Sequence, residues 1–153
     1  MSTVAVTVER DEGLNLGLLC YFPYRAMEAR VFDALAAGGF DDVTVAQGRI
    51  FQRIGPGGTR VTDLAEQARV TKQTAGFLVD QLERTGYVRR VADPADGRAR
   101  LVVIAERGLA AVELARVVER EVEAEWQAHL GAEVAAELRA ALERLREITD
   151  PYA

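Results

Sequence analysis

The residues best suited to chemistry lie in the stretch DPADGRAR, residues 93–100, between two short apolar and β-branched runs. A plain β-hairpin needs about two to five loop residues, so this loop is longer than the connection requires. Asp93-Pro94 and Asp96-Gly97 are turn-forming pairs, and we expect Asp96 to orient Arg98 through an ion pair. Arginine is drawn to the negative potential of a narrow DNA minor groove, although an ordinary hairpin with a solvated tip is the alternative. The basic side chains of this hairpin are Arg89, Arg98 and Arg100.

A second group of polar residues opens a helix expected over 72–85, with Thr71 as its cap. Gln73 is able to form two hydrogen bonds to adenine, and Thr74 to bond a phosphate or touch a thymine methyl group. The amides of a helix N-terminus also favour phosphate. The alternative is a set of exposed first-turn polar residues without a partner. The candidates on these helices, including the expected cap of a preceding short helix, are Thr62, Thr71, Lys72, Gln73 and Thr74.

Charge is segregated along the 153 residues, although the net charge is −5. Residues 1–48 carry 3 basic and 7 acidic side chains, residues 49–100 carry 10 and 6, and residues 101–153 carry 6 and 11. The segment that holds both candidate groups is therefore the one basic part of an acidic chain. Such a pattern is typical of a nucleic-acid-binding surface, and a mixed solvated surface is the alternative.

The sequence contains no arrangement of residues for catalysis or metal binding. One histidine, His129, and one cysteine, Cys20, exclude an internal disulfide and a histidine-rich metal site. There is no Ser-His-Asp set, and GPGG at 55–58 lacks the Lys-Ser/Thr of a phosphate loop. We therefore expect neither an enzyme nor a bound cofactor. Without a run of about 18 apolar residues or a recognisable signal peptide, we expect a cytoplasmic protein with no membrane partner.

Apolar periodicity and capping residues indicate a mainly α-helical (α+β) chain with one β-hairpin. Pro23 predicts that a first helix, over 14–37, either kinks or consists of a short segment before a helix that starts near the proline. Thr44 and Gln47 fit a capping box, and the helix they open carries Ile54. Further helices are expected over 63–68, 72–85 and 106–129, and after Gly131 to about 148. Gly38-Gly39 should stop the first helix, and Gly86 should end the helix over 72–85 in a left-handed conformation. The apolar stripe of that helix is expected to be Ala75, Leu78, Val79 and Leu82. Strands are expected over 87–91 and 101–104, with a short strand closing at Val61.

Two short helices joined by a tight turn, followed by a strand, a loop and a strand, make a winged helix-turn-helix. We place this part at 44–104; its second helix would enter the major groove and the hairpin would lie beside it. The stretch 61–108 resembles the MarR family of bacterial transcriptional regulators. The similar residues are TDLAEQARVTKQTAGFLVDQLERTGYV, followed by the wing pattern Asp93-Pro94 and Asp96-Gly97-Arg98. Ala105 departs from the family's usual threonine cap, which weakens that cap by about 1 kcal/mol.

The resemblance implies a sequence-specific DNA-binding regulator, a repressor, that binds a pseudo-palindromic operator as a homodimer. Residues 13–40 and 106–149 carry more apolar surface than one small winged domain can cover, which also indicates a second copy. An intramolecular bundle is the alternative. We therefore expect one domain over 1–153, with half-sites about 34 Å apart on double-stranded DNA.

Members of the family respond to small aromatic or phenolic ligands, so the resemblance implies an effector site. Its candidate residues are Cys20, Tyr21, Phe22, Tyr24, Arg49 and Phe51, each of which is alternatively a core residue. Cys20 and Tyr24 also resemble the peroxide-sensing branch of the family, but the branch's second tyrosine falls at Ala34. A lone cysteine on an apolar helix is usually a small buried residue. Redox sensing through Cys20, and a winged helix that binds only proteins, remain the alternative functions.

Overall fold

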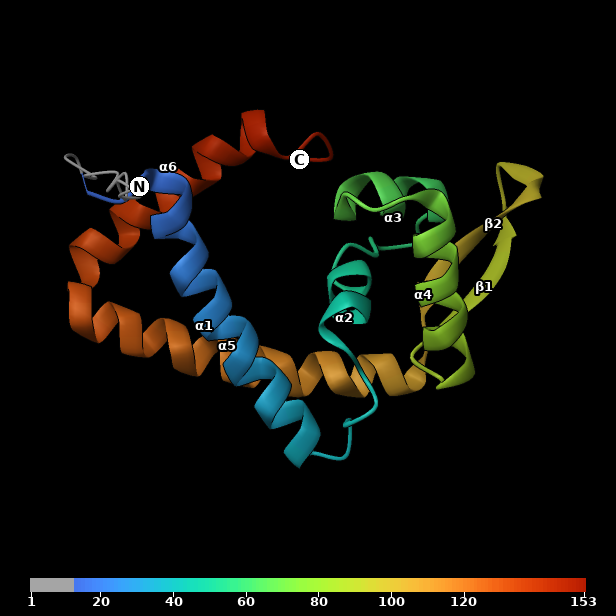
Figure 1. Cartoon of the computed structure of the whole chain (residues 1–153), viewed down its shortest axis with the longest axis horizontal. Coiled ribbons are helices and arrows are strands. Elements are labelled where there is room, and N and C mark those ends of the chain that lie inside the picture. The colour runs from blue at the N-terminus through green and yellow to red at the C-terminus, as the bar shows by residue number, and fades with distance from the viewer. Residues whose placement is uncertain (1–12) are drawn as a thin grey trace, which may run out of the picture.

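The structure of the chain, a computed structural model, describes residues 13–153. The amino-terminal stretch that we expect not to be a signal peptide lies almost wholly outside these residues. The elements are α1 (Leu16–Ala37), α2 (Val45–Phe51), α3 (Val61–Ala68), α4 (Lys72–Arg84), β1 (Val88–Asp93), β2 (Asp96–Ile104), α5 (Glu106–Leu130) and α6 (Ala132–Thr149). α1 and α6 lie at one end, α2 to α4 and the hairpin at the other, and α5 runs between them (Figure 1). The predicted mainly α-helical winged fold is confirmed.

Helix α1 runs without interruption through Pro23. It starts where the side chain of Asn15 accepts a hydrogen bond from the Leu18 amide at 2.9 Å. It ends at Gly38, and the following Gly39 has a φ of 94°, which glycine adopts without steric cost. The expectation of a separate short segment before Pro23 is therefore wrong, whereas the predicted glycine stop is confirmed.

The predicted capping box at the start of α2 is confirmed. The Thr44 hydroxyl accepts a hydrogen bond from the Gln47 amide at 3.1 Å, and the Gln47 side-chain oxygen accepts one from the Thr44 amide at 3.1 Å. The helix is shorter than predicted, because it ends at Phe51. Ile54 lies beyond its end and still packs against the core.

Helix α3 begins two residues before its predicted start. The Thr59 amide donates to the Val102 carbonyl at 3.0 Å, and the Val102 amide donates to the Thr59 carbonyl at 2.8 Å. This isolated bridge keeps the chain extended up to Arg60, which is the N-cap of α3 and makes no side-chain capping bond. Thr62 therefore lies inside the first turn, so its prediction as a cap is wrong, and the short extended piece closes before Val61.

Helix α4 holds the winged part together through its apolar stripe. Ala75, Leu78, Val79 and Leu82 are all buried, as predicted. They pack with buried side chains of α2, α3 and the base of the hairpin, among them Ile50, Leu64, Tyr87 and Val102. Thr71 caps the helix as predicted, and Gly86, just beyond its end, has the expected positive φ of 84°.

The hairpin strands run much further than predicted. β1 extends to Asp93 and β2 starts at Asp96, so the turn consists of Pro94 and Ala95. The register pairs Ala92 with Arg100 and Asp93 with Asp96, which leaves residues 97–99 of β2 without a partner. The expectation of a long charged loop is therefore wrong: a tight turn is followed by a bulged strand, and bulges increase local twist.

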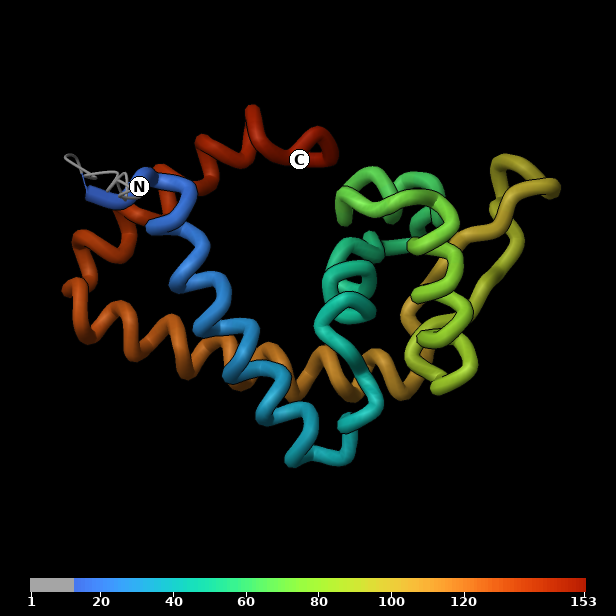
Figure 2. The backbone as a smooth tube through the Cα atoms, in the orientation of Figure 1, coloured from blue at the N-terminus to red at the C-terminus, as the bar shows by residue number. Residues whose placement is uncertain are grey.

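Helices α5 and α6 follow the predicted pattern, with Gly131 between them. Ala105 is the N-cap of α5 and provides no side-chain bond, as expected. α5 leads away from the hairpin, and α6 then returns, so that the carboxyl end lies near α3 (Figure 2). No residue of α6 is buried. None of the helices within residues 13–153 has the length and apolar character needed to cross a membrane.

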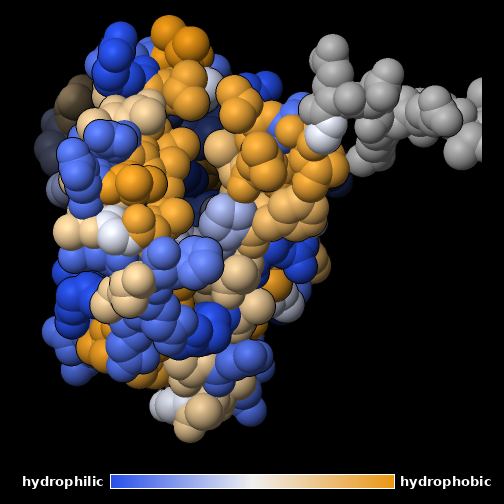
Figure 3. Space-filling view, turned by 90° about the vertical axis from the view of Figure 1, so that its left-hand side faces the viewer, coloured by the Kyte–Doolittle hydropathy of each residue, from blue (hydrophilic) through white to orange (hydrophobic). Residues whose placement is uncertain are grey.

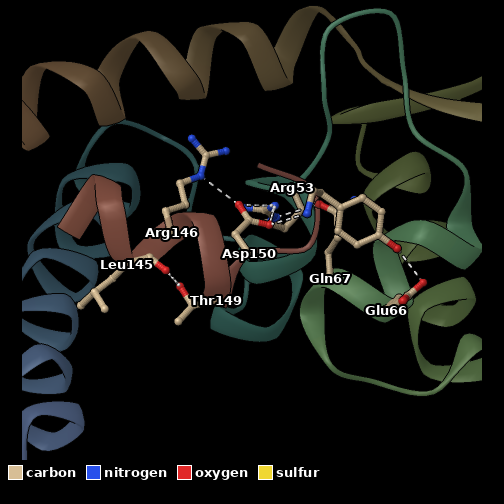
Figure 4. A network of polar contacts seen from close by, with 8 residues as sticks. Arg53, Glu66, Gln67, Leu145, Arg146, Thr149 and Asp150 are labelled. Atoms are coloured by element: carbon tan, nitrogen blue, oxygen red, sulfur yellow. Dashed lines mark hydrogen bonds and ion pairs between the residues drawn. The ribbon is translucent and has the colours of Figure 1, made fainter. Parts of the chain in front are cut away.

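A polar network, which we call the C-terminal clasp, joins the end of α6 to α2 and α3 (Figure 4). Asp150 accepts hydrogen bonds from Arg146 at 2.9 Å and from Arg53 at 3.1 and 3.3 Å. Arg53, just beyond α2, also donates to the Gln67 side chain of α3 at 2.8 Å. Tyr152 donates to Glu66 at 2.5 Å. The last residues of the chain therefore bond directly to the winged part.

Candidate nucleic-acid interface and effector cavity

The first turn of α4 is held open to solvent by its own cap. The Thr71 hydroxyl accepts a hydrogen bond from the Thr74 amide at 3.1 Å and donates one to the Thr74 hydroxyl at 2.9 Å. All four side chains from Thr71 to Thr74 are exposed. Thr62 is exposed as well, in the first turn of α3. The helix therefore presents polar groups at an end where its amides favour an anion.

The tip of the hairpin and the first turn of α4 lie at the same end of the winged part (Figure 1). Arg89, Arg98 and Arg100 are exposed on the two strands. Asp96 accepts a hydrogen bond from the Arg98 backbone amide at 3.1 Å, and its carboxylate lies 4.0 Å from Arg60. Within the described residues no ion pair joins Asp96 to Arg98, so the predicted orienting role is wrong at the side chain and holds only for the backbone.

Two ion-pair clusters fix the hairpin to the helices. Arg60, at the start of α3, bonds Asp93 at 2.8 and 3.2 Å, and this hydrogen bond holds the pKa of Asp93 below its ordinary value. Arg90 of β1 pairs with Asp80 at 2.8 Å and with Glu83 at 3.0 Å, both on α4. The position of the hairpin relative to α4 is therefore set before any ligand binds.

The remaining cations of the basic segment are free of such pairs. Six of the 10 basic residues in 49–100 form no ion pair with a carboxylate in the part of the chain that the structure describes. They are Arg69, Lys72, Arg84, Arg89, Arg98 and Arg100. All six are exposed. The paired arginines thus hold the hairpin to the helices or join the winged part to α1 and the end of α6, while the unpaired cations are available to an external anion.

A cavity of about 360 Å³ lies between α1, α2 and α5. Its wall is mainly apolar, and its polar groups converge on Glu28. Tyr24 donates to Glu28 at 3.0 Å, and Arg49 bonds the same carboxylate at 3.2 and 3.3 Å. Burial raises the pKa of Glu28, but the hydrogen bonds from Arg49 and Tyr24 lower it by more, so that its pKa lies below the ordinary value.

The predicted effector residues divide between this cavity and the outer surface. Tyr24, Arg49 and Phe51 line the cavity. Cys20, Tyr21 and Phe22 are not among its lining residues and are exposed on α1. The structure therefore brings only the first three together, with Glu28 as the group that the sequence reading did not include.

Residues 41–99 match the MarR family model, and several solved structures resemble the chain over most of its length. Tm0710, a transcriptional regulator from Thermotoga maritima, is 27% identical, with a TM-score of 0.61 over 88% of this chain and 93% of its own. Rv2887, a MarR family protein from Mycobacterium tuberculosis solved with salicylic acid, is 28% identical, with a TM-score of 0.63 over 88% and 98%. The chain has the winged-helix fold of these regulators and matches the MarR family model over its winged part. MepR from S. aureus, solved as a mutant bound to an oligodeoxyribonucleotide, is 21% identical and shares the fold, with a TM-score of 0.57 over 88% and 98%. No curated protein matches the chain at a significant level.

The chain exposes apolar side chains on the helices away from the winged part. Apolar residues gather over the end of the molecule that α1 and α6 form (Figure 3). On α6 the exposed apolar residues are Val134, Leu138, Leu142, Leu145 and Ile148, and on α1 they include Leu16 and Leu19. The α6 residues recur at helical spacing, so they form one stripe that nothing in the described chain buries.

The sequence did not point to several residues of this candidate site. Arg60 and Arg90 position the hairpin, but their partners lie on other elements and carry no local signal. Arg69, in the turn before α4, and Arg84, the last residue of α4, were identifiable as cations on or next to that helix. Phe77 was identifiable too, because it falls opposite the apolar stripe of α4.

Proposed function

We propose that this protein is a MarR-family transcriptional regulator that binds double-stranded DNA as a homodimer and is released by a small aromatic or phenolic effector. The observation that supports DNA binding best is the division of the basic segment. Two of its paired arginines, Arg60 and Arg90, hold the hairpin against α3 and α4, and its six unpaired cations stay exposed around α4 and the hairpin. A positively charged surface that is ordered in advance favours binding to a phosphate backbone, because little conformational entropy is lost.

The candidate residues divide into one that reads a base and several that contact the DNA backbone or the minor groove. Gln73 reads a base in the major groove, and Lys72, Thr71 and Thr74 contact phosphates beside it. Thr62 contacts the backbone from the first turn of α3. Arg98 and Arg100 reach the minor groove or the backbone from β2, and Arg89 contacts phosphate from β1.

The exposed stripe of α6 supports dimerisation through residues 13–40 and 106–149. A monomer would leave this stripe and the start of α1 in water, and burying them against a second copy removes that apolar area from solvent. Two-fold symmetry then places two copies of α4 on one face of the DNA. We propose that such an operator-bound dimer acts as a repressor.

The cavity between α1, α2 and α5 supports effector binding. Its size and apolar wall suit an aromatic or phenolic ligand, and Rv2887, 28% identical, was solved with salicylic acid. Because the cavity lies between α1 and α2, a ligand there would alter how the winged part sits on the dimer helices. Redox sensing through Cys20 is the second candidate, and the exposure of its thiol is the observation in its favour.

The test starts with selection of duplexes from a random double-stranded DNA library by the full-length protein. Light scattering then gives the mass in solution, and titration of the best duplex with salicylate tests release. We expect a particle of twice 16.7 kDa, one dominant sequence with two-fold symmetry, and weaker binding with ligand. A monomer that enriches no sequence would contradict the proposal and favour a module that binds only proteins.

A further inference from the structure

Phe77 is the largest exposed apolar side chain of the recognition helix. It lies in the middle of α4 and is 56% exposed, while the apolar stripe of the same helix is buried. With 3.6 residues per turn, Phe77 points away from that stripe and shares its face with Gln73, four residues before, and Arg84, seven residues after. The centre of the outward face of α4 is therefore aromatic.

The polar neighbours of Phe77 on this face differ in their availability. Asp80 is bonded to Arg90 at 2.8 Å, so it is committed to holding the hairpin. Gln73 is exposed, and it forms no side-chain hydrogen bond in the part of the chain that the structure describes. This face of α4 therefore offers one apolar group for contact with a base, the ring of Phe77, and one free hydrogen-bonding group, the side-chain amide of Gln73.

Thymine is the one unmodified base that presents an apolar group, its C5-methyl, in the major groove. Phe77 lies about 6 Å along the helix from Gln73, and successive bases of one strand rise by about 3.4 Å. The ring thus falls one or two base pairs from the base beside Gln73.

We propose that Phe77 determines sequence specificity by packing on the C5-methyl group of a thymine, one or two base pairs from the base that Gln73 reads. This inference rests on the proposed DNA-binding function. It gives the protein a base preference in each half-site that hydrogen bonding alone would not supply.

The test uses the best duplex selected by the wild-type protein and replaces its thymines by uracil, one at a time. Uracil keeps the base pair and removes only the methyl group. Wild type is expected to lose about fourfold in affinity at one thymine of each half-site, the effect of one buried methyl group. Phe77→Ala is expected to bind the thymine and uracil duplexes equally, and Phe77→Leu to keep part of the difference.

Val45→Ala is the matched control, because Val45 is an apolar residue that is 38% exposed on α2, outside the helices proposed for dimerisation. It should keep the wild-type sensitivity to uracil, and urea unfolding should show that all variants remain folded. The inference is overturned if every uracil duplex binds wild type as tightly as its parent, or if Phe77→Ala keeps the sensitivity. If wild type enriches no duplex at all, the proposed function itself fails, and this inference fails with it.

Discussion

Removing the wing arginine Arg98 should flatten the salt dependence of DNA binding. Each phosphate contact contributes about −0.9 to the slope of log affinity against log salt concentration. Six unpaired cations in each protomer set an upper bound of about −11 for a dimer that uses all of them. Arg98→Ala removes one contact per half-site, so the slope should become less steep by about 1.8.

This change in slope predicts how the affinity deficit depends on salt. Between about 50 and 200 mM salt, the gap between wild type and Arg98→Ala should narrow by about twelvefold. Fluorescence anisotropy on the selected duplex and on a scrambled duplex measures both slopes, and Arg98→Lys should restore most of the charge contribution. Arg98 lies on an exposed strand, so circular dichroism should show an unchanged fold.

Arg144→Ala provides the matched control, since Arg144 is exposed on α6 to one side of the apolar stripe proposed for dimerisation and forms no ion pair within residues 13–153. It should leave both the slope and the affinity unchanged. Equal slopes for wild type and Arg98→Ala on both duplexes would refute the assignment of the hairpin as a DNA-binding wing.

Four further predictions concern stability and sensing. Tyr87→Phe removes the hydroxyl that donates to Asp42 at 2.5 Å and should lower the free energy of unfolding by about 1–2 kcal/mol, measured by urea denaturation; an unchanged urea midpoint would show that this bond adds nothing. Hydrogen bonds from Arg107 and Tyr87 hold the pKa of Asp42 below its ordinary value of 3.8. The ionised carboxylate should therefore stabilise the fold above about pH 4, and this stabilisation should be lost as the pH falls further. Asp42→Asn should make the urea midpoint depend less on pH on the acid side, and an equally steep dependence would show that Asp42 is not its source. Gly108→Ala would push a methyl group into the backbone carbonyl oxygen of Tyr87 and should destabilise the fold by about 1–3 kcal/mol, which thermal unfolding would detect. Cys20→Ser should bind DNA as wild type does, and release of DNA by hydroperoxide in wild type alone would favour redox sensing over the effector cavity.

The sequence predicts best where the signal is local. The capping box of Thr44 and Gln47, the apolar stripe of α4 and the glycine stops involve residues within a few positions of one another, so their spacing alone identifies them. Thr62 was misplaced because a threonine favours a cap locally, while the distant bridge of Thr59 to Val102 decides where α3 begins.

The candidate site shows the same division. Exposed polar residues at the start of α4 follow from the cap at Thr71. The extent of the hairpin does not follow from nearby residues, because Asp93 is held by Arg60, which lies on another element. The effector cavity was half predicted for the same reason: helical spacing groups Cys20, Tyr21 and Tyr24 on one helix, but only the packing of α2 and α5 decides which of them face inward.

The C-terminal clasp joins the end of α6 back to the winged part, so that α5, α6 and the winged part form a closed loop. The winged part is joined to the other helices at three places: by the chain between α1 and α2, by α5 after the hairpin, and by the bonds of Arg53 and Glu66 to the residues that follow α6. Rotation of α4 relative to α6 therefore requires the hydrogen bonds of the C-terminal clasp to break together. If the protein dimerises through α6, these bonds fix the distance between the two copies of α4. Breaking the bonds of Asp150 or Tyr152 would allow each winged part to rotate relative to α6 and would make that distance variable.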